Sequence, residues 1–437
     1  MQNPDPRSRR PGWAGRNYRI QTAATVISGL GNAGAPIATA FAVLATGGST
    51  TEIGYVTAAR LVPLVLLLLV GGALADRLPR HHVMVAANTF NALSQAALAA
   101  LVLTGTARLW ELVLLSAAGG AGQAFYGPAA GAMLMQTVAR EHAARAFSVY
   151  RMALNGAQIG GAALGGALTA ATGPGWVLAL DALGFLVAAA LRVLLDVPPA
   201  AGRGTGGAAT PGGVRGAGRG DGMIHELREG WHEFASRRWL WVIVLQFSVL
   251  MACVSAVDAV YGPIVAEQRL GGARDWGLAL AADGAGLVLA GLLMVRWRPR
   301  RILLVGNHGV FLFALPAAAL AVAAPLPVLA LAMFLSGAGV TVFGVNWMVA
   351  LQQEIPAATM SRVSAYDAFG SLALAPLGTA LAGPAATALG LGGALWLCAA
   401  LTVLLSIVVL AEPQVRRLGR RAAGPVGGPG NTPATVG

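Results

Sequence analysis

Two long apolar runs, residues 55–75 and 83–103, are joined by a short and highly charged connection. Each run has about the 20 residues that a helix needs to cross the hydrocarbon core of a bilayer. The connection carries one carboxylate, two guanidiniums and two imidazoles: Asp76, Arg77, Arg80, His81 and His82. Ionised groups of this kind are costly inside a membrane. The pattern therefore predicts two antiparallel membrane helices with a charged hairpin at the membrane surface.

The composition identifies the whole chain as an integral membrane protein. Apolar residues make up 56% of its 437 residues, and all thirty basic residues are arginines. The absence of lysine excludes a P-loop ATPase and any Schiff-base chemistry, because both require an amine. Cys253 and Cys398 lack the nearby His or Cys residues of a metal site, so we expect both to be small buried side chains.

We predict twelve membrane-spanning helices, six in each half of the chain. The expected spans of the first half are 19–44, 53–75, 82–104, 110–137, 144–171 and 175–196. Those of the second half are 239–265, 276–296, 300–323, 327–353, 361–388 and 390–411. Residues 1–18 form an Arg-rich tail without a cleavage site, which we expect to be retained, and residues 412–437 form a second tail.

The net charge of +12 orients the chain in the membrane. If both termini are cytoplasmic, twenty-six arginines fall on or just inside that side, three fall outside, and Arg60 lies within a span. The charge is thus explained without nucleic acid. The Arg, Ala and Gly bias also suggests a bacterial genome of high GC content, so we expect a multi-pass protein of the bacterial cytoplasmic membrane.

A linker, residues 197–238, separates the two halves. Its first part, 198–222, is rich in Gly, Pro and Arg and cannot bury a core, so it should be flexible. Within residues 223–235, apolar side chains recur at helical spacing between charged ones. This pattern predicts a short helix in the inner membrane interface. A docking site for a soluble partner is the alternative.

The two halves are similar at equivalent positions. Gly72 and Arg77 match Gly291 and Arg296 at an offset of 219 residues. Residues 148–150 (Ser-Val-Tyr) match 364–366 (Ser-Ala-Tyr) at an offset of 216. Such offsets predict an internal repeat of six helices.

The charged hairpin resembles the loop between helices 2 and 3 of major facilitator superfamily transporters. The matching residues are Gly72, Asp76, Arg77 and Arg80, while Pro79 stands where that pattern has glycine and His81 where it has a basic residue. An ordinary positively charged cytoplasmic loop is the alternative interpretation. The resemblance implies an all-α membrane protein of twelve transmembrane helices in two pseudo-symmetric six-helix bundles. It also implies a gating role for the loop.

Two further stretches resemble the multidrug, macrolide and siderophore exporters of that superfamily. Residues 160–166 (Gly-Gly-Ala-Ala-Leu-Gly-Gly) are similar to the antiporter motif, although Ala162 replaces its proline, and close packing of small residues explains the glycines equally well. Residues 353–383 are similar to the matching stretch of the exporters. The resemblance implies an exporter of a small amphiphilic compound. Because no nucleotide site is present and carboxylates lie within the spans, we expect protons to drive it. We also expect a monomer that needs no cofactor and no metal.

Three other kinds of protein are alternatives to the exporter. An importer of a small metabolite would have the same fold. A membrane enzyme such as a polyprenyl transferase needs clustered aspartates for magnesium diphosphate, and no two Asp residues lie within four positions of each other here. A sensor would need a signalling domain, and none is visible. We therefore predict a transporter rather than an enzyme.

Charged residues inside the predicted spans fall into two layers, leaving aside Asp181, which lies on span 175–196, a probable scaffold span. Arg60, Asp258 and Asp283 lie about 10 Å from the external ends of their spans, and Arg151 and Asp367 about 10 Å from the internal ends. By resemblance, the external gate closes between spans 1–2 and 7–8, and the internal gate between spans 4–5 and 10–11. We predict that Arg60 pairs with Asp258 or Asp283 when the outside is shut, and Arg151 with Asp367 when the inside is shut.

The outer layer has more carboxylates than arginines, so Asp258 or Asp283 is the predicted proton carrier. The alternative is that these charges reach toward the headgroups or satisfy buried backbone. By resemblance, the substrate cavity is lined by spans 1, 4, 7 and 10. The polar and aromatic residues there are Asn32, Gln123, Tyr126, Gln136, Gln246, Tyr261, Asn346 and Trp347. That lining suits a largely neutral, aromatic or amphiphilic molecule.

Overall fold

The computed structural model describes residues 14–77, 80–138, 142–195, 231–232, 234–297, 299–356 and 359–419, and the side chains of residues 68–80 are outside this description. The described residues form helices and no strand. Helices of the first half are α1 (Arg16–Ala45), α2 (Thr50–Arg77), α3 (Arg80–Leu103), α4 (Leu109–Gln136), α5 (Ala143–Thr172) and α6 (Pro174–Val193). Those of the second half are α8 (Arg238–Ala256), α9 (Gly262–Arg269), α10 (Ala273–Arg296), α11 (Ile302–Val310), α12 (Ala314–Ala321), α13 (Leu326–Glu354), α14 (Met360–Leu372), α15 (Ala375–Ala411) and α16 (Pro413–Arg417).

The helices agree with an all-α membrane fold. Nine helical stretches in the described residues are long and apolar enough to cross a membrane, so the count of twelve spans stays a prediction. Every predicted span coincides with one or more of the observed helices. The N-terminal tail to residue 13, the linker through residue 230 and the tail beyond residue 419 lie outside the described residues.

Three of the predicted spans are interrupted just before a proline. A proline cannot donate a hydrogen bond to the carbonyl four residues earlier. A π-helical turn, Val257–Tyr261, therefore precedes Pro263, and a 3-10 turn, Phe311–Phe313, precedes Pro316. Likewise, α14 ends at Leu372, four residues before Pro376, so the span predicted as 361–388 is two helices.

The boundary predicted between the last two spans lies at Gly390. This residue has a φ of +73° in the middle of α15, a conformation that favours glycine. The chain therefore reverses direction there without a separate loop. The predicted spans 361–388 and 390–411 correspond to the two sides of this kink.

The helices form two bundles, α1–α6 and α8–α15, which contact each other mainly through α5 with α10 and through α2 with α15. Small residues allow these close approaches: a Cβ on Gly166 would lie 2.7 Å from the Cα of Gly277, and one on Gly54 would lie 2.4 Å from the carbonyl oxygen of Thr379. One apolar core contains residues of both bundles, including Phe41, Tyr261 and Trp276.

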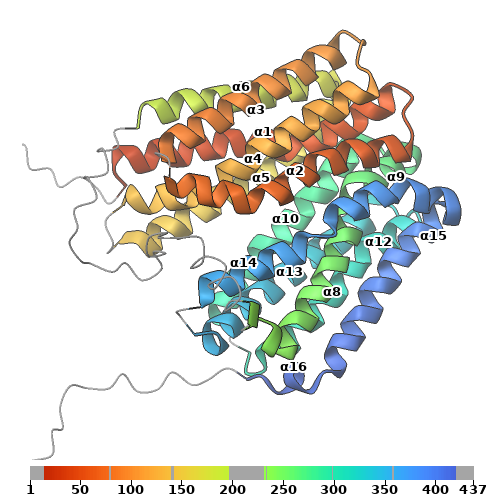
Figure 1. Cartoon of the computed structure of the whole chain (residues 1–437). Coiled ribbons are helices and arrows are strands. Elements are labelled where there is room, and N and C mark those ends of the chain that lie inside the picture. Colours follow the sequence, from red (N-terminus) through yellow and green to blue (C-terminus); the bar gives the residue numbers. More distant parts are fainter. Residues whose placement is uncertain are drawn as a thin grey trace, which may run out of the picture.

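All of these contacts lie toward the ends of the helices that are joined by residues 46–49 and 270–272. Figure 1 shows the two bundles together at that end, near α9, and diverging toward the end where α14 lies. The structure is therefore closed at one end of the molecule. The start of α1 at Arg16 and the start of α16 at Pro413 both lie at the opposite end.

Candidate functional site

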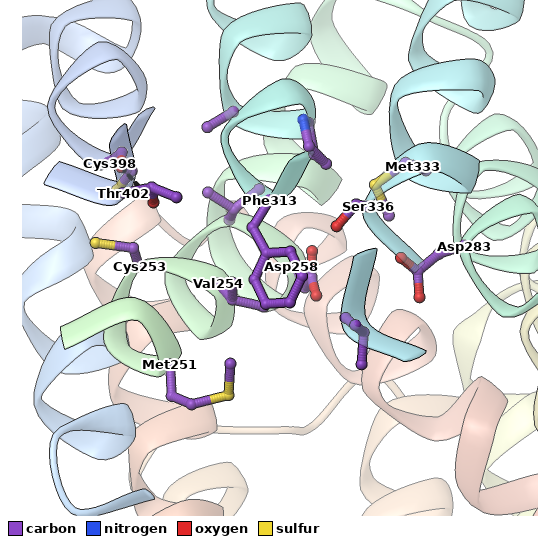
Figure 2. A pocket seen from close by; sticks show the side chains of 14 residues that line it. Met251, Cys253, Val254, Asp258, Asp283, Phe313, Met333, Ser336, Cys398 and Thr402 are labelled. Carbon is purple, nitrogen blue, oxygen red and sulfur yellow. Dashed lines mark hydrogen bonds between the residues drawn. The ribbon is translucent and has the colours of Figure 1, made fainter. Parts of the chain in front are cut away.

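A cavity inside the second bundle brings together Asp258 and Asp283, two of the charges predicted within the spans (Figure 2). Asp258 belongs to the π-helical turn before Pro263, and Asp283 belongs to α10. π-Helical turns occur frequently at functional sites. The rest of the lining is apolar, sulfur-containing or hydroxyl-bearing: Met251, Cys253, Val254, Val257, Phe313, Pro316, Ala317, Met333, Ser336, Val340, Cys398 and Thr402.

Neither carboxylate has a cationic partner in the described part of the chain. The charged group that acts on Asp258 is the Asp283 carboxylate. Both side chains are only partly buried, because they face the cavity. Two carboxylates that share an apolar cavity without a cation disfavour a state in which both are ionised. The cavity therefore suits a proton or a cationic group.

Asp283 also lies at the interface of the two bundles. It lines a second cavity between α5 and α10, together with Asn155, Gln158 and Gly284. Gly284 lies against the side chain of Ile159 on α5, which keeps the two helices close there. A change at Asp283 can therefore act on both the cavity of the second bundle and the contact between bundles.

Arg60 does not form the predicted ion pair. Its Nη2 donates hydrogen bonds to Asn32 Oδ1 at 2.8 Å and to Gln123 Oε1 at 3.2 Å, both within the first bundle. The prediction of a pair with Asp258 or Asp283 at a closed external end was wrong for this conformation. Its physical reason is that Arg60 points into its own bundle, where neutral amides satisfy it and Asp181 supplies the nearest negative charge.

Asp181 is a buried residue whose role the sequence did not reveal. Its exposed fraction is 0%, and its Oδ2 accepts a hydrogen bond of 2.8 Å from Gln95 Nε2 on α3. Its Oδ1 has no partner in the described residues. An aspartate in an otherwise apolar span was the available signal, because such residues are rare in membranes and usually functional.

Arg192 is the second functional candidate that sequence reasoning missed, because it was counted among the arginines just inside the membrane surface. It is fully buried between helices. Its Nη2 donates to Tyr126 at 2.7 Å and to Thr25 at 3.0 Å, and its guanidinium lies 5.0 Å from the centre of the Tyr126 ring. The side chain therefore turns into the bundle instead of reaching toward the headgroups.

The structure divides the predicted cavity residues between the two bundles. Asn32, Gln123 and Tyr126 lie inside the first bundle as partners of Arg60 or Arg192. The side chain of Gln136 is outside the described residues. Two predicted cavity residues of the second bundle, Gln246 and Tyr261, bond to a neighbouring helix. Gln246 donates to Ser406 at 3.0 Å, and Tyr261 donates to the carbonyl of Ala382 at 2.9 Å.

The remaining two, Asn346 and Trp347, lie on α13. Asn346 is fully buried and donates to the carbonyl of Val342. Trp347 Nε1 donates to Asp367 Oδ2 on α14 at 2.9 Å. Asp367 is thus held by an indole while Arg151, its predicted partner, is exposed on α5. The two bundles diverge at this end, so the Arg151–Asp367 pair predicted for a closed inner gate stays a prediction.

The gating loop is only partly described. The side chains of Asp76, Arg77 and Arg80 lie outside the described residues. The backbone places Gly72 in α2, and α2 contacts α14. Most of the predicted interfacial helix also lies outside the description. At its end, the rings of Trp231 and Phe234 lie 5.5 and 6.1 Å from that of Tyr366 on α14.

The glycines of residues 160–166 lie in close helix contacts. A Cβ on Gly161 would lie 2.3 Å from the carbonyl oxygen of Leu30, and one on Gly165 would lie 2.4 Å from the Cα of Gly34. Both contacts join α5 to α1, whereas Gly166 faces α10. These glycines therefore serve helix packing, which was one of the two interpretations of the motif.

The family model described as Major Facilitator Superfamily matches residues 22–373. The multidrug efflux pump Tap of Mycolicibacterium fortuitum is 27% identical over 419 residues, which cover 90% of this chain and 95% of that protein. The nucleoside transporter NupG has a TM-score of 0.68 at 13% identity and covers 91% of this chain and 98% of its own. An inward-facing, unoccupied bacterial homologue of the human lysosomal transporter Spinster has a TM-score of 0.64 at 17% identity, covering 94% and 100%. Both structural likenesses concern the fold.

Proposed function

Because the chain belongs to the Major Facilitator Superfamily, we propose that it is a transporter that exports a small amphiphilic compound in exchange for protons. The observation that carries the direction of transport is the similarity to the efflux pump Tap, which extends over nearly the whole of both chains. The energy source follows from the residues, because the chain has no lysine for a phosphate-binding loop and has several carboxylates within its helices.

The proton carriers in this proposal are Asp258 and Asp283. They share a cavity without a cationic partner in the described residues, so binding a proton removes the repulsion between them. Apolar and sulfur-containing side chains around them suit the apolar part of an amphiphilic compound. Proton and substrate would compete for these carboxylates, which is the simplest way to couple an exchange.

The second element of the proposal is alternating access between two bundles. The end that carries residues 46–49 and 270–272 is the external one if both termini are cytoplasmic, as the arginine distribution predicts. The described conformation would then face the cytoplasm. Closure of the inner end would bring α4 and α5 toward α13 and α14 and would allow Arg151 to replace Trp347 as the partner of Asp367.

Transport by everted membrane vesicles tests the function. The compounds to be tested are those that stabilise the purified protein in a thermal-shift screen of antibiotics, siderophores and metabolites. We expect an acidic vesicle lumen to drive their accumulation and a protonophore to abolish it. The Asp258→Asn, Asp283→Asn double variant should insert normally but lose the response to the proton gradient.

The same experiment separates the exporter from an importer with the same fold. Accumulation in right-side-out vesicles, and none in everted ones, would identify an importer. If accumulation by the wild-type protein does not depend on the imposed pH difference, transport is not coupled to protons. A double variant that still responds to the gradient would remove Asp258 and Asp283 as the carriers.

A further inference from the structure

Three helices of the first bundle, α1, α3 and α6, meet at one buried carboxylate. Asp181 on α6 lies against Gly31 on α1, where an added Cβ would lie 2.5 Å from Oδ1 and 2.8 Å from the Asp181 Cα. Gln95 on α3 donates to Oδ2. Arg60 on α2 bonds to Asn32 on α1 and to Gln123 on α4, next to these contacts. The side chain of Asp181 is fully buried.

The hydrogen bonds around Asp181 fit a neutral acid better than an ion. Gln95 supplies one donor to Oδ2, while Oδ1 has no donor among the described residues. An ionised carboxylate at this depth would keep a charged oxygen unpaired, which is far more costly than an unpaired hydroxyl. In a protonated Asp181, Oδ2 would be the carbonyl oxygen that accepts the hydrogen bond from Gln95, and Oδ1 would carry the proton.

One cation can compensate the charge if the proton leaves. The helices packed against α6 are α1, α3 and α5, and their titratable residues lie away from Asp181, in the first turns or the first third of each helix. These residues are Arg16, Tyr18, Arg19, Arg80, His81, His82, Arg145, Tyr150 and Arg151. Arg192 is about 16 Å along α6 itself. The charge of Arg60 is the one that acts on Asp181.

Arg60 is held in a way that permits a shift toward Asp181. Its bonds are to two neutral amides, Asn32 and Gln123, both on helices whose family counterparts line the cavity. Gly31 and Asn32 are consecutive, so the same turn of α1 touches Asp181 with one residue and Arg60 with the next. Loss of a proton from Asp181 would draw Arg60 away from both amides.

We propose that Asp181 is a second proton-binding site, inside the first bundle. When Asp181 loses its proton, Arg60 moves toward it and its hydrogen bonds to Asn32 and Gln123 break. The site adds to the proposed proton-coupled function, and it is separate from the carboxylates of the second bundle. Buried amides on the same face of α3, Asn88 and Asn91, keep unpaired polar atoms and continue the polar stripe from Gln95 toward the start of that helix. They offer a polar route along which the proton can exchange.

Infrared difference spectroscopy of the purified protein during a pH titration tests the proposal without any substrate. We expect a carbonyl band of a protonated carboxylic acid that disappears at high pH and is missing from Asp181→Asn. The band should persist in Asp258→Asn and in Asp283→Asn, which are the matched carboxyl-to-amide controls. A spectrum of Asp181→Asn that equals the wild type would overturn the proposal.

Two further variants identify the band if Asp181→Asn does not fold. Gln95→Leu removes the hydrogen bond to the carbonyl, so the band should move to higher wavenumber. Arg60→Gln removes the compensating cation, so the midpoint of the titration should move to higher pH by about one unit or more. A band that both variants leave unchanged is not that of Asp181 and contradicts the proposal. Failure of proton-driven export with this titration intact would reject the proposed function alone.

Discussion

Single side chains in the first bundle show how this fold accommodates charge within a membrane. Arg192 has no carboxylate partner among the described residues, and its hydrogen bonds go to neutral oxygens of Gln21, Thr25, Tyr126 and Ala188. The planar guanidinium can reach several acceptors at once, which a lysine cannot do. A buried cation satisfied in this way fixes the relative positions of α1, α4 and α6.

Replacement of Arg192 by alanine should therefore destabilise the first bundle. The change leaves a cavity and unpaired polar groups, for which we expect a cost of about 2–4 kcal/mol. Thermal unfolding of the purified protein would measure it, and Arg192→Lys should fall between alanine and wild type. The exposed Arg151→Ala is the control, because its loss should leave the melting temperature nearly unchanged. Equal melting temperatures for Arg192→Ala and wild type would contradict this assignment.

Asp367 is the residue through which the inner gate can be tested. In the described conformation its Oδ2 accepts a hydrogen bond from Trp347 and Arg151 is exposed. If the two charges pair when the inner end closes, Arg151→Asp and Asp367→Arg should each abolish transport. The exchange of both residues should restore a measurable part of it. Equal inactivity of the single and double variants, with normal insertion, would count against the pair.

At the scale of helices, glycines decide how closely the elements pack. In α5, three glycines face α1 or α10 at distances that no larger residue could keep, whereas Gly156 faces open space. Apolar helices in a lipid environment associate by close packing rather than by the hydrophobic effect. The closed end of the molecule therefore depends on the Gly166–Gly277 contact more than on its apolar side chains.

Substitution of Gly166 by valine should push α5 and α10 apart and open the closed end. Spin labels on Thr106 and Gly271, both exposed in loops at that end, would report the change as a longer distance in pulsed electron resonance. Gly156→Val on the same helix is the matched control and should leave the distance distribution unchanged. An unchanged distribution in both variants would show that the contact does not hold this end closed.

The hairpin between α2 and α3 is the second element whose role can be measured. The resemblance implies that Asp76 lies near the N-terminus of α14 when the transporter faces outward, and α2 contacts α14 in this structure. A carboxylate at a helix N-terminus contributes up to about 2 kcal/mol in a partly buried site, enough to bias a conformational equilibrium more than tenfold. We expect Asp76→Asn to insert normally and to slow transport severely.

The control for Asp76→Asn is Glu52→Gln, which neutralises a carboxylate at the other end of the same helix. Glu52 accepts hydrogen bonds from Ser49 in the preceding loop, so its loss affects only a local cap. Transport by Glu52→Gln should stay close to wild type. If Asp76→Asn transports at the normal rate, the hairpin serves only to orient the chain in the membrane.

For the whole molecule, the orientation in the membrane decides whether the described conformation faces the cytoplasm or the outside. The bundles contact each other at the end that carries residues 46–49 and 270–272 and diverge at the other end (Figure 1). Reporter fusions after residue 437 and within 203–220 should read cytoplasmic, and fusions at 270–274 should read external. A cytoplasmic reading at 270–274 beside cytoplasmic readings at the other two sites would overturn the span count.

The sequence alone determined the class of protein and the positions of its helices. Apolar run length and the free-energy cost of charge in a bilayer act locally, so residues 55–75 and 83–103 specified α2 and α3 without reference to the rest of the chain. Proline alone did not determine the helix breaks, because helices are interrupted before Pro263, Pro316 and Pro376 but run through Pro36 and Pro63. The family resemblance of the hairpin was confirmed by the family match.

Only the tertiary structure decided which charges meet. Depth along a helix placed Arg60, Asp258 and Asp283 in one layer, but the direction of each side chain depends on helix rotation and on neighbours from other helices. Asp258 and Asp283 do share a cavity, whereas Arg60 turns toward Asn32 and Gln123. Asp181 and Arg192 became candidates because packing buries them completely, and burial depends on contacts between residues far apart in the sequence.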